Sequence, residues 1–320
     1  MDCISFIVPV YNEEDTIGIF HKEICHFFET KIDSNKYTFE LVFVNDGSID
    51  KTPLILNELF KNNKNITVVN FSRNFGKENA LFAGLEHVSN PKNRGGIIIP
   101  IDVDLQDPLH VIATMLQKYE EGYDVVLAQR VQRDKDSFLK KFTAEQFYKV
   151  YNSISKTKLE PNVGDFRLMT KKVVNEILKL PENQLFMKGV FNWVGFRTAI
   201  VQYNREERIA GKTKFNGYKL WNLALEGITS FSTIPIRIWL YIGSFIAFLS
   251  FILGIKVLIE KFFFGIEENG YASLIVSVFF IGGVQLIGIG ILGEYIGRIY
   301  MEVKRRPKYI VENLLKNEEK

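Results

Sequence analysis

The sequence predicts an α/β fold with a mostly parallel sheet, followed by two helices that cross a membrane. Short apolar runs alternate with helical patterns over residues 3–130, as expected for consecutive right-handed βαβ units. Two later runs, residues 238–259 and 272–293, carry almost no charge and are long enough to span the hydrocarbon core of a bilayer. The chain therefore divides into a polar N-terminal part and an apolar C-terminal part.

The elements of the N-terminal part are recognised by their period and by their ends. The first strand follows Met1 almost directly, so we expect no signal peptide. The polar and acidic stretch 12–16 after this strand is typical of a helix start. We expect strands at residues 3–8, 40–45, 66–71, 97–101 and 125–130, and helices at residues 16–28, 53–61 and 76–88.

The residues after strand 97–101 have two interpretations. Asp102 and Asp104 follow a buried strand, where ligands of open α/β sheets bind, and they offer hard oxygens to a divalent cation. Alternatively, this stretch is a helix start with solvated carboxylates. In both interpretations Asp107, just before Pro108, is expected to cap the next helix.

Polar residues at other strand ends favour a shared site. Tyr11 and Glu13 follow the first strand, Asp46 the second, and Arg130 the last. The carboxyl ends of parallel strands lie on one edge, so these side chains should converge, whereas helix caps need no common destination. The sequence contains neither a P-loop nor a Gly-x-Gly-x-x-Gly pattern, which disfavours those nucleotide sites.

The composition narrows the range of partners. The net charge is +3, from 40 basic and 37 acidic residues, so no overall field favours nucleic acid. The four histidines and the two cysteines, Cys3 and Cys25, have no metal-ligand spacing. The two cysteines fit a reduced compartment.

Six motifs resemble those of a known family. Residues 8–14, 44–52 and 102–106 resemble glycosyltransferase family 2, whose GT-A fold is Rossmann-like with a mostly parallel sheet. Residues 72–77, 164–168 and 208–215 are similar to the polyprenyl-phosphate sugar transferases, the group that includes dolichol-phosphate mannose synthase and the bactoprenol glucosyltransferases. With the two apolar runs, the resemblance covers nearly the whole chain.

The resemblance implies roles for residues at the strand ends. It implies a donor site that binds a nucleotide sugar together with Mg²⁺ or Mn²⁺, and Asp104, Asp165, Arg208 and Lys214 as catalytic residues. Asp165 would position the acceptor or stabilise charge on the sugar, because a lipid phosphate is already largely ionised and hardly needs a base. The implied substrate-binding residues are Pro9, Tyr11, Glu13, Val44, Asp46, Asp102, Val103, Arg130 and Lys212, and the implied metal ligands are Asp104 and Gln106.

The expected organisation has four parts. A cytoplasmic catalytic domain (1–214) precedes an amphipathic interfacial segment (215–236), a transmembrane hairpin (237–297) and a basic cytoplasmic tail (298–320). Basic residues flank the hairpin on both sides, which predicts that both termini lie in the cytoplasm. The expected location is the bacterial inner membrane. Small residues such as Gly293 and Gly297 permit close helix packing, and we expect a homo-oligomer.

The expected reaction is the inverting, metal-dependent transfer of one sugar to a polyprenyl phosphate, for cell-envelope glycan modification. UDP-glucose and undecaprenyl phosphate are the favoured substrates, with mannose or another sugar as the alternative. A processive polysaccharide synthase is a second alternative, although residues 184–193 lack the Gln-x-x-Arg-Trp element of those enzymes. A non-catalytic membrane scaffold is a third, against which the intact Asp102/Asp104 pair argues.

Overall fold

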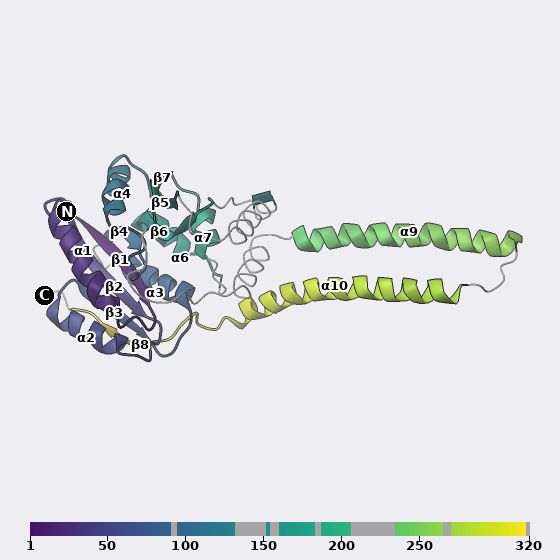
Figure 1. The fold of residues 1–320 in the computed structure, drawn as a ribbon, viewed down its shortest axis with the longest axis horizontal. Helices are drawn as coiled ribbons and strands as arrows, with labels where there is room; N and C mark the ends of the chain where they lie inside the picture. Colours follow the sequence, from purple (N-terminus) through teal and green to yellow (C-terminus); the bar gives the residue numbers. More distant parts are fainter. Residues whose placement is uncertain are drawn as a thin grey trace.

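A computed structural model describes residues 1–90, 95–131, 152–153, 160–182, 187–205, 234–264 and 270–317. Figure 1 shows an α/β body from which a long helical hairpin projects. The predicted interfacial segment 215–236 lies outside these ranges except for its last three residues.

One sheet organises the described part of the body. Its strand order is β7-β5-β6-β4-β1-β2-β3-β8. The parallel pairs are β1–β2, β1–β4, β2–β3 and β5–β7, while β6 and β8 run antiparallel to their neighbours. The prediction of a mostly parallel sheet is confirmed. The strands are β1 (Asp2–Val10), β2 (Tyr37–Asn45), β3 (Ile66–Phe71), β4 (Gly95–Pro100), β5 (Val125–Arg130), β6 (Val163–Thr170), β7 (Thr198–Tyr203) and β8 (Val311–Leu315).

Helices cover both faces of this sheet. Side chains alternate along β1, so that Phe6 joins the core under one layer and Ile7 joins the core under the other, which is the period of a strand buried on both faces. One layer comprises α1 (Ile17–Lys31), α2 (Thr52–Asn62) and α4 (His110–Glu120), and the other comprises α3 (Lys77–Ser89), α6 (Lys171–Leu178) and α7 (Met187–Trp193).

The antiparallel strand β6 has a consequence for the site. The parallel strands β1, β2 and β4 end at one edge of the sheet. Because β6 runs the opposite way between β4 and β5, it begins at that same edge. Gly164 and Asp165, at the start of β6, therefore lie beside the residues that follow β4.

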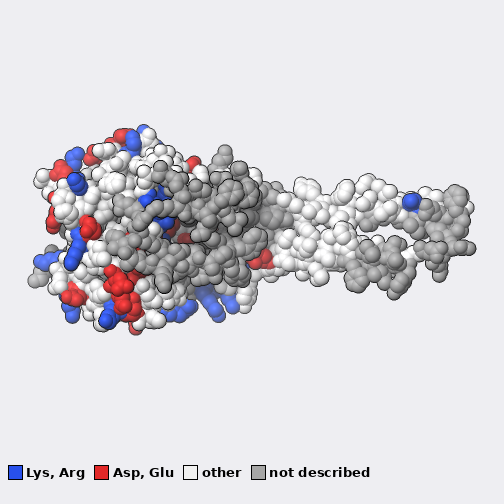
Figure 2. All heavy atoms as spheres, in the orientation of Figure 1, with Lys and Arg blue, Asp and Glu red and all other residues white. Residues whose placement is uncertain are grey.

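The hairpin consists of α9 (Ile234–Phe264) and α10 (Tyr271–Lys304). The two helices lie side by side (Figure 1), and Trp239 packs so closely on Gly288 that a Cβ there would be 2.0 Å from its Nε1. The described hairpin surface is almost free of charge (Figure 2). Among the described residues, Phe280–Lys304 is long and apolar enough to cross a membrane, and Tyr241–Leu253 is a shorter apolar stretch. The second span stays a prediction.

The C-terminal segment returns to the body. Residues 298–320, expected as a basic tail, include the last turns of α10 and strand β8, which pairs with β3. Tyr309 stacks on Phe71, the last residue of β3, with ring centroids 4.8 Å apart. The base of the hairpin is thus joined to the sheet at the edge where the parallel strands end. Periodicity alone does not reveal a five-residue strand that pairs with a partner more than 200 residues away.

Candidate active site

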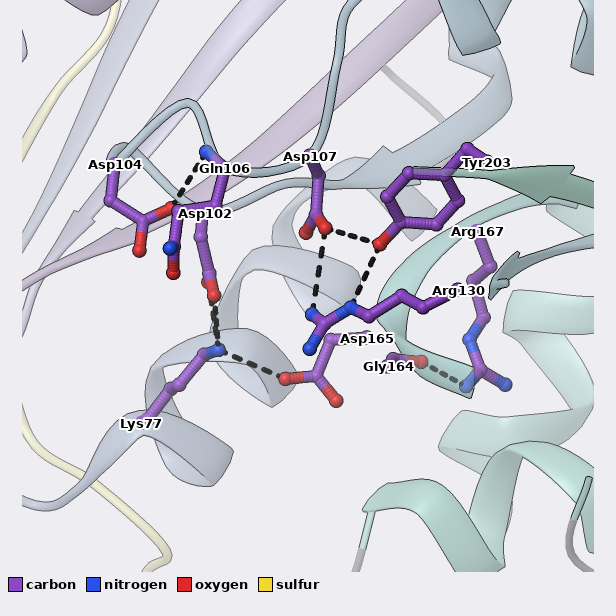
Figure 3. A network of polar contacts seen from close by, with 10 residues as sticks. All are labelled: Lys77, Asp102, Asp104, Gln106, Asp107, Arg130, Gly164, Asp165, Arg167 and Tyr203. Carbon is purple, nitrogen blue, oxygen red and sulfur yellow. Dashed lines mark hydrogen bonds and ion pairs between the residues drawn. The ribbon is translucent and has the colours of Figure 1, made fainter. Parts of the chain in front are cut away.

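The polar residues after β4 form a tight turn at the carboxyl edge. The backbone N–H of Gln106 donates a hydrogen bond to Asp104 Oδ1 at 3.2 Å, and Leu105 between them has a left-handed backbone (φ 53°). Asp102, Asp104 and Gln106 are all half-buried. Figure 3 shows them beside residues from α3, β5, β6 and β7. The predicted convergence of Asp102, Asp104 and Arg130 at one edge is confirmed by this geometry.

Lys77, the first residue of α3, joins two of the carboxylates. Its Nζ lies 2.7 Å from Asp102 Oδ1 and 2.9 Å from Asp165 Oδ2 (Figure 3). Burial alone would lower the pKa of Lys77, but the two carboxylates raise it above its usual value. The sequence-based interpretation did not single out this residue.

Asp46 holds the loop that precedes Lys77. Its side chain is buried and accepts hydrogen bonds from the backbone N–H of Phe75 (2.6 Å) and Gly76 (3.0 Å). Burial raises the pKa of Asp46, and the two N–H groups partly oppose that shift. The structure therefore uses this carboxylate to position a loop, while its predicted contact with the nucleoside is untested.

A buried triad anchors Arg130. Its Nε donates to the Tyr203 hydroxyl at 3.0 Å, and its Nη2 lies 3.5 Å from Asp107 Oδ1. The Tyr203 hydroxyl donates to the same Asp107 oxygen. Burial raises the pKa of Asp107, against the opposing effect of the Arg130 guanidinium. The expectation that Asp107 caps a helix was wrong, because α4 has no side-chain cap and its N-cap residue is Leu109.

Strand β6 brings Asp165 to the site and buries Arg167 behind it. Gly164 makes room for Arg130, since a Cβ at this position would be 3.3 Å from its Nη2. Arg167 Nη2 donates to the Gly164 carbonyl at 2.7 Å, and its guanidinium lies over the Phe191 ring. Burial lowers the pKa of Arg167 to about 10, so this group remains a cation at neutral pH.

The loops after β1 and β2 are tied together beside the turn. The Asn12 N–H donates to Ser48 Oγ at 3.0 Å, and the Glu13 N–H donates to Thr52 Oγ1 at 2.9 Å. Tyr11 and Glu13 are partly exposed on this edge.

Other predicted site residues differ in their surroundings. Pro9 and Val44 are neighbours in the β1–β2 register. Val44 is fully buried in the core and offers no surface to a ligand in this conformation, and Val103 is almost as buried. Arg208, Lys212 and Lys214 lie outside the described residues, so their roles stay predictions.

Asp104 and Gln106 have the chemistry of a Mg²⁺ or Mn²⁺ site that substrate completes. Both provide hard oxygens from one half-buried turn. No group of three or more His, Cys, Asp or Glu side chains suited to a metal occurs within the ranges the structure describes. Mg²⁺ commonly binds one or two carboxylates and takes its other ligands from phosphates and water. The turn fits a cation of this kind.

Comparisons with known proteins match most of the chain. The family described as Glycosyl transferase family 2 matches residues 5–178. The bactoprenol glucosyl transferase of Shigella phage SfV is 56% identical over 97% of this chain and 98% of its own length. A prophage bactoprenol glucosyl transferase homolog of Escherichia coli K12 is 55% identical, over 98% of this chain and 99% of that relative.

Proposed function

The chain belongs to glycosyl transferase family 2 and is a glycosyltransferase; from that premise we propose that it transfers one glucose from UDP-glucose to undecaprenyl phosphate. Support for the acceptor and the sugar comes from relatives named bactoprenol glucosyl transferases, which match nearly the whole chain. The observation that carries the chemistry is the convergence of Asp102, Asp104, Asp165 and Arg130 at one edge of the GT-A-like sheet.

The donor would bind across the carboxyl edge. The partly exposed Tyr11 and Glu13 form the nucleoside side of the site, with Asp102 toward the ribose. Asp104 and Gln106 would hold Mg²⁺ or Mn²⁺, which when bound neutralises charge on the diphosphate leaving group. Arg130 adds a fixed positive charge, because Tyr203 and Asp107 already hold its guanidinium in place. Donors arranged in advance stabilise developing charge without reorganisation.

The transfer itself would be a single displacement. A phosphate oxygen of the acceptor forms a bond to the anomeric carbon while the bond from that carbon to the diphosphate breaks, so the configuration inverts. The acceptor phosphate has a second pKa near ~6 and is largely a dianion at neutral pH. Asp165 would therefore position the acceptor or stabilise positive charge on the sugar, and Arg208, Lys212 and Lys214 would bind phosphates.

The hairpin would place this site against the membrane. We propose that α9 and α10 both span the bacterial inner membrane, with the body on the cytoplasmic side. The stacking of Tyr309 on Phe71 supports this arrangement, because it joins the base of the hairpin to the carboxyl edge. The anionic headgroup of a polyprenyl phosphate would then reach the site without leaving the bilayer surface.

The proposal is tested with purified protein and radiolabelled nucleotide sugars. Wild-type protein should move label from UDP-glucose into a lipid fraction only when undecaprenyl phosphate is present. A stronger signal from GDP-mannose or another donor would replace the proposed sugar, and a labelled polymer would indicate a processive synthase. Donor binding without any transfer would indicate a scaffold.

A further inference from the structure

Lys77 connects parts of the site that come from three separate elements. Its ammonium, at the start of α3, contacts Asp102 after β4 and Asp165 at the start of β6. In the proposed reaction these carboxylates lie on the donor side and on the acceptor side. Two carboxylates at such a distance from one cation would repel each other without it. Lys77 therefore sets the spacing between the two sides of the site (Figure 3).

The position of Lys77 in its helix is unfavourable by itself. A lysine in the first turn meets the positive end of the helix dipole, where acidic residues are preferred. Its side chain is 47% exposed overall, but the ammonium itself is desolvated between the two carboxylates, and the cost of desolvating a charge offsets much of what its ion pairs contribute to folding stability. A contribution of these two contacts to folding stability therefore does not explain why a lysine occupies this position.

Hydrogen bonds and close packing hold the backbone before Lys77 in place. Gly76 has a φ of 97°, and its N–H and that of Phe75 bind the buried Asp46 carboxylate. Gly47 lies so close to this loop that a Cβ would be 2.3 Å from the carbonyl carbon of Arg73. The end of β2 thus determines where α3 begins and where the ammonium lies.

We propose that Lys77 is a positioning residue of the transfer reaction, which holds Asp165 at a fixed place beside Asp102. The inference rests on the proposed function, because it assumes that Asp165 acts on the acceptor side. Lys77 also contacts Asp102 on the donor side, but we expect it to act mainly through Asp165. Its loss should therefore slow the transfer step and leave donor binding almost unchanged.

A double-mutant cycle tests this coupling. Lys77→Met should lower kcat about 100-fold, with the donor KM within about twofold of wild type, since transition-state positioning is lost and ground-state binding is kept. In an Asp165→Asn background the same change should cost less than about threefold, because residues that act together are not additive. Lys77→Arg keeps the charge and should recover part of the lost rate. Lys118→Met is the matched control, because Lys118 pairs with Glu121 away from the site.

Four results would overturn the inference. Independent losses from Lys77→Met and Asp165→Asn, which multiply in the double variant, would show that Lys77 does not act through Asp165. A large rise in donor KM would make Lys77 a donor ligand instead. A fall in melting temperature of more than a few degrees would assign it a structural role. Wild-type protein that makes no glucolipid would overturn the proposed function, and this inference with it.

Discussion

Removing the Tyr203 hydroxyl should both destabilise the body and weaken donor binding. The hydroxyl donates to Asp107 and accepts from Arg130 Nε at 3.0 Å in a buried environment. Tyr203→Phe keeps the ring and its edge contact with Phe166, so no cavity forms. It leaves a buried carboxylate and a guanidinium each short of one partner.

The size of the effect follows from the charges involved. Hydrogen bonds to charged groups contribute about 1.5–3 kcal/mol each, and the network loses two while its remaining groups relax. A net loss of about 2–3 kcal/mol lowers the melting temperature by roughly 4–12 °C for a domain of this size. The freed Arg130 should also raise the donor KM by about 5- to 30-fold, if roughly 1–2 kcal/mol of phosphate binding is lost.

Thermal unfolding in detergent and donor-dependent kinetics measure both effects. Tyr119→Phe is the control, because its hydroxyl donates to Asp2 at the exposed surface and should change the melting temperature little. If Tyr203→Phe matched wild type in melting temperature and donor KM, the buried triad would not hold Arg130 for the donor.

Three further predictions concern the metal turn, one histidine and one glycine. Asp104→Ala should abolish transfer, and chelation of divalent cations should abolish it in wild type; activity that survives both, assayed with labelled donor, would contradict the metal assignment. Burial, with a smaller effect of Lys316, lowers the pKa of His87 to about 4 from 6.5, so between these values the unfolded chain binds a proton that the folded chain does not. The free energy of unfolding should fall by up to about 3 kcal/mol as the pH drops from 6.5 to 4, and His87→Gln should flatten that dependence in melting curves; an unchanged slope would contradict it. Gly47→Ala should destabilise the fold by roughly 1–3 kcal/mol and reduce kcat, because φ is 66° and a Cβ would strike the Arg73 backbone; an unchanged melting temperature and kcat would show that this loop adjusts freely.

Local sequence patterns predicted which polar residues lie at the carboxyl edge of the sheet, because parallel strands place their carboxyl ends together. Asp102 and Asp104 could be assigned to that edge from the apolar run before them. The direction of β6 could not be predicted in the same way, because pairing with β4 and β5 is a tertiary property. The contact of Lys77 with Asp165 depends on that direction, which is why the sequence pointed to Asp165 only through a resemblance.

Burial explains why the role of Asp107 was misjudged. Asp107 follows a strand and precedes a helix, which is the local pattern of a cap, but its side chain turns inward to Tyr203, 96 residues away. Val44, which the resemblance implies for substrate binding, lies wholly in the core, and its role stays a prediction. Lys77 ends the motif 72–77 of the resemblance and lies at the start of a helix, where the helix dipole disfavours a lysine, but neither signal indicates its contact with Asp165.

The most direct test of the central claim is the anomeric configuration of the product, measured by NMR on lipid made from UDP-glucose and undecaprenyl phosphate. A single displacement at the carboxyl edge predicts one glucose per lipid phosphate, with the configuration opposite to that of the donor. Retention of configuration, several sugars per lipid, or the absence of any glucolipid would contradict the account.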